Sequence, residues 1–218
     1  MRRLLTVLLM GPLALIAGCG DNGAGSPAAP LGRQGLARAL ERAHAAGRVP
    51  MHLTVTTTRP GRGTRPQFSA DGELDLAARA GRATLHTPEA GGVTLPDLPV
   101  SWTADDVTAG HDTIARSRAH IEGGQLGMLP DETQALAELV ADATDIRESD
   151  NGHWTFTVRA ANAVQRGIPP QPEPGDTWQG AAWAGADGTL RRVALTLPTP
   201  ALGPAIAAGF TTIELRLG

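Results

Sequence analysis

Residues 177–198 read TWQGAAWAGADGTLRRVALTLP and decide the fold, because they contain two strand-like segments joined by a tight turn. The turn is Asp187-Gly188, a pair that favours the positive φ angles of a two-residue hairpin loop. After it, Val193, Leu195 and Leu197 alternate with other residues and therefore share one face of a strand. Such a short connection joins antiparallel strands, since parallel strands need a long crossover.

The same alternation is found on both sides of this hairpin. Residues 153–159 follow a tight turn at 150–152, and residues 209–217 lie at the end of the sequence. Each segment is predicted to be a strand with one apolar face and one face rich in Thr and Arg. The alternating apolar positions of the two segments are Trp154, Phe156, Val158, Ile213, Leu215 and Leu217.

Earlier in the chain, alternating residues predict further short strands. Met51, Leu53 and Val55 mark the first, and a second is expected through Phe68. Asp71-Gly72 then predicts a hairpin turn before ELDLAA at 73–78, because Asp-Gly between alternating runs is a strong hairpin signal.

Two more strands are expected before the middle of the chain. RATLHT at 82–87 predicts one, and the segment around Trp102 predicts the other. Residues 87–99, between them, are rich in Pro and Gly and indicate a loop. We expect HDTIARSRAHIE at 111–122 to pair with the Trp102 strand.

Two segments have the spacing of helices. QGLARALERAHAAG at 34–47 places Leu36, Leu40 and Ala43 on one face and ends at a glycine. LPDETQALAELVADA at 129–143 is the second predicted helix, with Asp131 and Gln134 at the spacing of a capping box. Its apolar face consists of Leu136, Leu139 and Val140.

Many short strands and two helices predict an α+β fold. Antiparallel strands with one apolar face need a cover over that face. Two helices are few for about eight to ten strands, so we expect the sheet to curve around two or more helices as a half-barrel. The expected domain spans residues 33–218 and is monomeric.

The first 32 residues have a different character. MRRLLTVLLMGPLALIAG at 1–18 has two arginines, a short apolar run and a small-residue ending, which together predict a signal peptide. Ile16-Ala17-Gly18-Cys19 resembles the lipobox of bacterial lipoproteins, which implies cleavage before Cys19 and lipidation of its sulfur. Residues 19–32 then form a flexible tether rich in Gly, Ala and Pro. We expect the domain to be lipid-anchored at the extracytoplasmic face of a bacterial cell membrane.

The sequence contains no recognisable catalytic or nucleotide-binding motif. We find no G-x-S-x-G, H-E-x-x-H, P-loop or dinucleotide motif, so we expect no enzymatic activity, no catalytic residues, no cofactor and no metal. His111-Asp112 and His120-x-Glu122 are more simply read as polar positions on a solvated strand face. A net charge of −3 argues against nucleic-acid binding. Three arginines between residues 59 and 65 fit either phosphate head groups or a solvated loop, and we favour the loop.

The order of these pieces resembles a known family. A lipobox and tether precede a helix, and the mid-chain helix ETQALAELVADATDIRES at 132–149 precedes GHWTFTV. WAGADGTLRRVALTL and FTTIELRLG follow. This order is similar to that of actinobacterial lipid-carrier lipoproteins of the LppX/LprG type, which are related in fold to the LolA carrier. The resemblance implies a half-barrel whose apolar cavity binds a lipid or glycolipid.

The implied cavity would be lined by apolar residues from most of the predicted strands and from the second helix. Trp154 and Phe156 fit ordinary core packing as well as a cavity wall, and Trp178 and Trp183 must face opposite sides of their strand. An alternative function is a cell-envelope interaction or sensing lipoprotein that has this fold and no cargo. The expected lining residues are Leu53, Val55, Leu74, Leu76, Leu85, Trp102, Leu136, Val140, Trp154, Phe156, Val158, Trp183, Val193, Leu195, Ile213 and Leu215.

Overall fold

A computed structural model describes residues 31–89, 95–122, 133, 135, 136, 138–150, 152–159, 177–199, 201 and 207–218. The predicted signal peptide, Cys19 and the tether up to residue 30 lie outside these residues, as do Asp131 and Gln134. The described elements are α1 (Leu31–Ala45), β1 (Arg48–Arg59), β2 (Gly63–Asp75), β3 (Ala80–His86), β4 (Leu98–Trp102), β5 (Asp106–Ala109), β6 (Asp112–Ala115), α2 (Arg116–Glu122), a 3₁₀ turn η1 (Val140–Asp142), β7 (Thr144–Asp150), β8 (His153–Arg159), β9 (Thr177–Ala184), β10 (Leu190–Thr199) and β11 (Gly209–Leu217).

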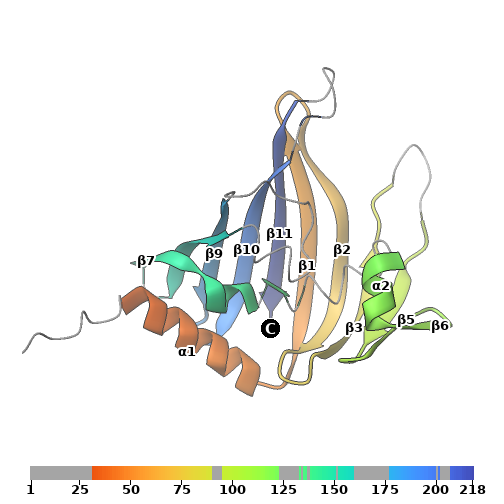
Figure 1. Cartoon of the computed structure of the whole chain (residues 1–218), viewed down its shortest axis with the longest axis horizontal. Coiled ribbons are helices and arrows are strands. Elements are labelled where there is room, and N and C mark those ends of the chain that lie inside the picture. The colour runs from red at the N-terminus through yellow and green to blue at the C-terminus, as the bar shows by residue number, and fades with distance from the viewer. Residues whose placement is uncertain are drawn as a thin grey trace, which may run out of the picture.

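All eleven described strands form one antiparallel sheet, in the order β6-β5-β4-β3-β2-β1-β11-β10-β9-β8-β7. The sheet is open and curved (Figure 1). Each neighbouring pair is also consecutive in sequence except β1 and β11, which pair from Met51–Leu217 to Thr58–Phe210. This pairing joins the N-terminal and C-terminal halves of the chain. The antiparallel pairing of all the described strands and the curvature of the sheet confirm the predicted fold class.

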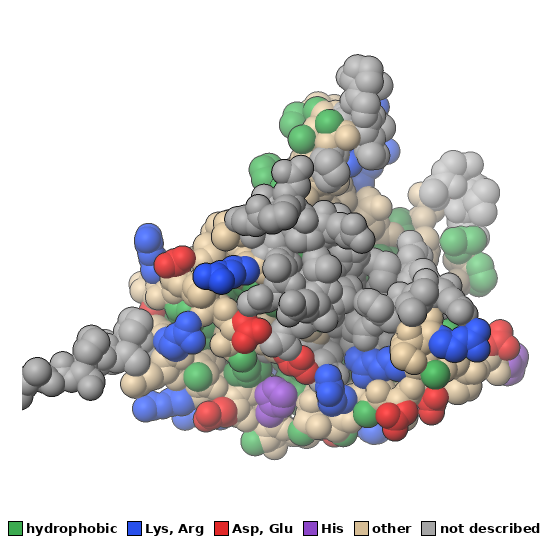
Figure 2. Space-filling view, viewed as in Figure 1, with side chains coloured by type: hydrophobic (Ala, Val, Ile, Leu, Met, Phe, Trp, Pro, Cys, Tyr) green, Lys and Arg blue, Asp and Glu red, His purple; other side chains and the backbone are tan. Residues whose placement is uncertain are grey.

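Helices α1 and α2 lie at opposite flanks of the sheet (Figure 1). Helix α1 contacts β7 and β10, whereas α2 contacts β5 and β6. The apolar face of α1 is buried, and its other side carries charged side chains on the surface (Figure 2). The five described residues between 133 and 139 are helical, as predicted, and Leu136 and Leu139 among them are buried.

Several predicted turns are confirmed by their backbone angles. Gly188 has φ +71° in the β9–β10 turn, and Gly152 has φ +83° in the β7–β8 turn. Gly47, with φ +68°, follows the end of α1 as a C-terminal glycine does. Only residues that tolerate the left-handed region suit these positions, so the sequence signal was local and direct.

The prediction of a hairpin at Asp71-Gly72 is wrong. Strand β2 runs without interruption from Gly63 to Asp75, and the turn to β3 follows at 76–79. Gly72 is required there for close approach, because a Cβ on it would collide with the carbonyl oxygen of Arg82 and with Ala83 on β3. Asp71 is a strand residue whose Oδ1 lies 2.6 Å from Nδ1 of His52 on β1.

The segment 111–122 was predicted to pair with the Trp102 strand and does not. Its first part is β6, which pairs with β5, and its second part is helix α2. The short strand β5 lies between β4 and β6 and pairs with Trp102 through Val107. Residues 144–149, placed in the mid-chain helix by the resemblance, instead form most of strand β7. Strands β5 and β7 are thus additional, and the two strands expected around Asp71-Gly72 are one, which gives eleven described strands against the eight to ten expected.

Candidate functional site

The most extensive feature of the sheet is an apolar row on one face, which we call the inner face. The row runs through cross-strand partners on eight neighbouring strands. The partners, from β8 to β4, are Trp154, Ala182, Val193, Leu215, Leu53, Ala70, Leu85 and Leu98. All are buried except Leu98, which is partly buried and packs against the same cluster.

A second row on the same face lies beside the first. It consists of Phe156, Gly180, Leu195, Ile213, Val55 and Phe68, on six neighbouring strands. Gly180 has no side chain to contribute because the Phe156 ring lies over it, and a Cβ there would collide with that ring. Alternation at a period of two, combined with this register, places one continuous apolar surface on the inner face.

Every residue predicted to line the cavity, except Trp183, belongs to one buried cluster. The strand residues among them come together because the register aligns them in rows. Leu136 and Val140 join the cluster from outside the sheet. Leu36, Ala39, Leu40 and Ala43 complete it from helix α1.

Trp183 lies on the other face, which we call the outer face. Its ring stacks on His153 with a centroid distance of 4.9 Å and an interplanar angle of 8°. The guanidinium carbon of Arg192 lies 4.1 Å from the ring centroid. Trp183 therefore does not belong to the inner surface, and Trp178, which is 1% exposed, takes that role on β9.

The choice between the two tryptophans could have been made from the sequence. Thr177 and Gln179 share a strand face with Trp183, whereas Gly180 and Ala182 share the face of Trp178. Polar neighbours at even spacing mark the outer face of a half-buried strand. Thr177 and Gln179 therefore identify Trp183 as the outer residue.

A charged cluster on the outer face joins β10 and β11. Glu214 is 14% exposed and accepts hydrogen bonds from Arg192 Nη2 and Arg216 Nε, each at 2.6 Å. Burial alone would raise the pKa of Glu214, but these two hydrogen bonds and the positive charge of both arginines outweigh burial and lower it. The cluster therefore stabilises the ionised carboxylate.

Replacing Glu214 with glutamine is expected to destabilise the fold by about 1–2 kcal/mol at pH 7, because hydrogen bonds to a charged group are lost. A lowered pKa in the folded state means that this stabilisation is present above the ordinary glutamate pKa and is lost as the pH falls. Urea denaturation should therefore show a wild-type advantage at pH 7 that narrows below about pH 4.

The matched control for this prediction is Glu73→Gln. Glu73 pairs with Arg82 at 2.8 Å on the same outer face, but both side chains are more exposed. An exposed pair contributes little, so we expect a change within about 0.5 kcal/mol. An equal loss in both variants would show that burial of the Glu214 carboxylate is not what matters.

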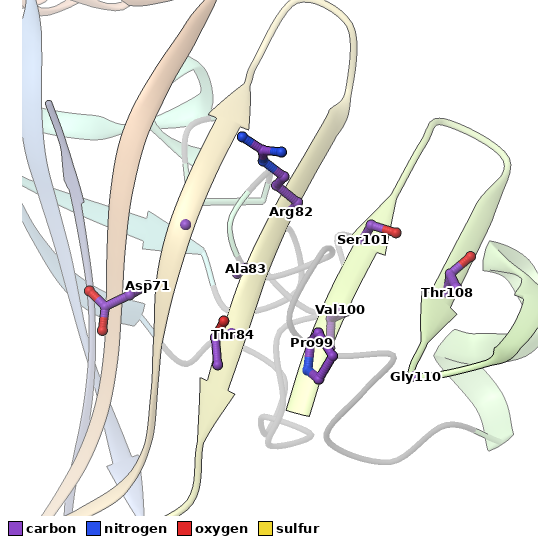
Figure 3. A pocket seen from close by; sticks show the side chains of 10 residues that line it. Asp71, Arg82, Ala83, Thr84, Pro99, Val100, Ser101, Thr108 and Gly110 are labelled. Atoms are coloured by element: carbon purple, nitrogen blue, oxygen red, sulfur yellow. The ribbon is translucent and has the colours of Figure 1, made fainter. Parts of the chain in front are cut away.

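A hollow of about 330 Å³ lies on the outer face over β2 to β5 and is lined in part by polar side chains. Figure 3 shows Asp71, Arg82, Thr84, Ser101 and Thr108 around it. Its charged groups already have partners: Asp71 lies 2.6 Å from His52, and Arg82 pairs with Glu73. It has neither the extent nor the apolar character of the inner face.

Within the described parts of the chain, no group of three or more His, Cys, Asp or Glu side chains is arranged to hold a metal ion. His111 and Asp112, which we read as solvated polar positions, are exposed. A search of the same residues finds no helix with the length and apolarity needed to cross a membrane.

Comparison with solved structures identifies the class of fold. LprF from Mycobacterium bovis superposes with a TM-score of 0.51 and 14% identity, over 89% of this chain and 94% of that one. The lipoprotein LppX from Mycobacterium tuberculosis follows with a TM-score of 0.47 and 15% identity, over 85% and 92%. A LolA-superfamily protein from Nitrosomonas europaea has a TM-score of 0.34 and 10% identity, over 86% and 93%. No protein-family model and no curated protein matches the chain.

The likeness to LprF shows that this chain has an open, curved antiparallel sheet of the LolA/LppX-like kind. This is the fold that the sequence resemblance implied. At 14% identity the likeness concerns the fold alone, so the function has to be argued from the inner face.

Proposed function

We propose that this protein is a membrane-anchored extracytoplasmic lipoprotein that binds the acyl chains of a lipid or glycolipid against the inner face of its sheet. The observation that carries the proposal is the apolar row that runs through eight neighbouring strands without a charged, hydroxyl or amide side chain. The protein acts by holding its cargo out of water and makes or breaks no bond.

The physical basis is the burial of hydrocarbon. Each acyl CH₂ group removed from water contributes about 0.8 kcal/mol, so a row of this length matches a ligand made of long methylene chains. Trp102 adds one polar group at the β4 flank. Its indole N–H is buried and has no acceptor within the described structure, so an ester or hydroxyl oxygen of the cargo is a suitable partner.

The predicted lipidation of Cys19 supports the location. A lipid carrier has to work beside a membrane, and the anchor would keep the domain there. The fold shared with LprF and the sequence resemblance to lipid-carrier lipoproteins point in the same direction.

The experiment that tests the proposal uses residues 20–218, which contain every described helix and strand. We expect native mass spectrometry of this protein, purified without detergent, to show bound lipid, and organic extraction to release it. The delipidated protein should then take up a fluorescent fatty-acid probe. If the protein neither co-purifies with lipid nor takes up the probe, the carrier function is ruled out. The alternative, an interaction or sensing lipoprotein that binds no cargo, then remains.

Two neighbouring substitutions on β2 make the test specific for the inner face. Ala70 is fully buried in the inner row, whereas the residue before it, Ser69, points to the outer face. Ala70→Phe is expected to fill inner space and lower probe uptake several-fold, and Ser69→Phe to leave it unchanged. If Ala70→Phe instead only destabilises the fold, the inner face is already filled by the chain's own side chains.

A further inference from the structure

A second hollow lies where helix α1 crosses the ends of β8, β9 and β10. Its volume is about 360 Å³, and its walls are mostly glycine and alanine residues of α1 and of the β7–β8 and β9–β10 turns. Among the described residues that line it, the side chains that carry charge or a hydrogen-bonding group are Arg38, Arg42 and Trp154. We call it the basic pocket, because its described lining residues include two arginines and no carboxylate.

The two arginines lie one turn apart on the exposed side of α1. Arg42 donates a hydrogen bond from Nη1 to the backbone oxygen of Asp187 at 2.7 Å, which holds its guanidinium over the β9–β10 turn. Gly188 makes room for it, since a Cβ at that position would collide with Nη1. Arg38 forms no hydrogen bond or ion pair with a residue that the structure describes.

Trp154 is the third donor. It is 3% exposed, and its Nε1–H has no acceptor among the described residues. The indole packs beneath Gly35, where a Cβ would lie 3.1 Å from the ring and 3.4 Å from Nε1. A buried donor without a partner is unfavourable, so an incoming acceptor near Gly35 would be favoured.

This set of groups selects one class of ligand. Two guanidinium groups and an indole N–H offer only donors, and arginine binds phosphate with two parallel hydrogen bonds. The small side chains of the described walls leave room for a compact anion. The nearest carboxylates have partners of their own, because Glu148 accepts from the Gly152 N–H at 3.4 Å and Asp187 accepts from Arg191 at 2.8 Å. The chemistry therefore fits a phosphate group.

The position of the pocket indicates where that phosphate comes from. About 12 residues separate Cys19 from Leu31, and they can span at most about 40 Å. Arg38 lies about 10 Å along the helix axis from Leu31. A membrane that holds a lipidated Cys19 is thus within reach of the pocket, while the β1–β2 hairpin with its exposed Arg62 and Arg65 lies at the far end of the sheet (Figure 1).

We propose that the basic pocket, through Arg38, Arg42 and Trp154, binds the phosphate of an anionic phospholipid headgroup and so orients the domain on the membrane. The placement rests on the proposed anchor at Cys19, but it does not depend on the carriage of acyl chains.

The test measures sedimentation of residues 20–218, which lack the lipid anchor, with vesicles of phosphatidylglycerol or of phosphatidylcholine. We expect binding to phosphatidylglycerol only. Arg38→Gln/Arg42→Gln should weaken it about 10- to 30-fold, as expected for two arginines at an anionic surface. Arg62→Gln/Arg65→Gln removes the same charge from the hairpin and should change binding less than about 3-fold.

Additional variants and a soluble phosphate ligand show which part of the proposal fails if binding is not as expected. The single variant Arg38→Gln removes a guanidinium group that forms no hydrogen bond within the described structure. A clear loss of vesicle binding with an unchanged melting temperature therefore supports the site. Equal losses in the two double variants would overturn it, as would binding of glycerol phosphate without binding to vesicles. Probe uptake should be unchanged in Arg38→Gln/Arg42→Gln, so failure of this site is distinguishable from failure of the carrier function.

Discussion

Replacing Cys19 with serine is expected to move the protein from the membrane fraction to the soluble fraction. A serine hydroxyl cannot take the place of the thiolate as the group that accepts the lipid. Anchoring by two or more acyl chains is stable, since each buried CH₂ contributes about 0.8 kcal/mol, so removal of the anchor should change the partition by several orders of magnitude. Detergent phase partition of cell extracts measures this change.

Intact mass provides the control for this experiment. The wild-type protein should lack residues 1–18 and carry the mass of a diacylglyceryl group on Cys19. An uncleaved signal peptide in the Cys19→Ser variant would also keep it in the membrane, and its mass would reveal this. Ser26→Ala, in the tether, should leave the partition unchanged. Wild-type protein without added lipid mass would contradict the predicted anchor.

Replacing Leu53 with alanine is expected to cost about 2–5 kcal/mol of folding stability, which is a large part of the total for a single domain. Leu53 is fully buried in the middle of the sheet and pairs with Leu215 on β11 and Ala70 on β2. Its loss weakens the place where the two halves of the chain meet. Urea denaturation followed by tryptophan fluorescence measures the change.

Thr54→Ala is the matched control, since Thr54 is the next residue on β1 and points to the outer face. A change within about 0.5 kcal/mol is expected there. If Leu53→Ala also costs less than about 1 kcal/mol, Leu53 is not packed as the structure places it. A loose inner face that adjusts to the missing atoms would then be the simplest explanation.

Local signals in the sequence predicted the strands and most of the turns. The turn at Asp187-Gly188 could be predicted because its positive φ depends on those two residues. The pair Asp71-Gly72 has the same letters and lies inside a strand, because the backbone of β3 approaches so closely that only glycine fits. Glycine is thus needed for a positive φ angle in one Asp-Gly pair and for the close approach of a strand in the other. Only the position of the neighbouring strand distinguishes the two cases.

The candidate site shows the same division. Alternation alone identified the apolar face of β1, β8, β10 and β11 correctly. On β9 both faces carry a tryptophan, and we assigned Trp183 to the inner face although Arg192 and His153 hold it on the outer face. The basic pocket was not predicted, because Arg38 and Trp154 are distant in sequence and meet only where α1 crosses the sheet.

The sequence by itself determined that this chain forms short antiparallel strands with one apolar face, and it predicts export and lipidation. These features depend on side-chain periodicity and on residues adjacent in the chain. Only the tertiary structure decided that β1 pairs with β11, which aligns the apolar positions of eight strands in one row. The physical reason is that pairing between distant segments depends on the register and approach of whole strands, which no local pattern encodes.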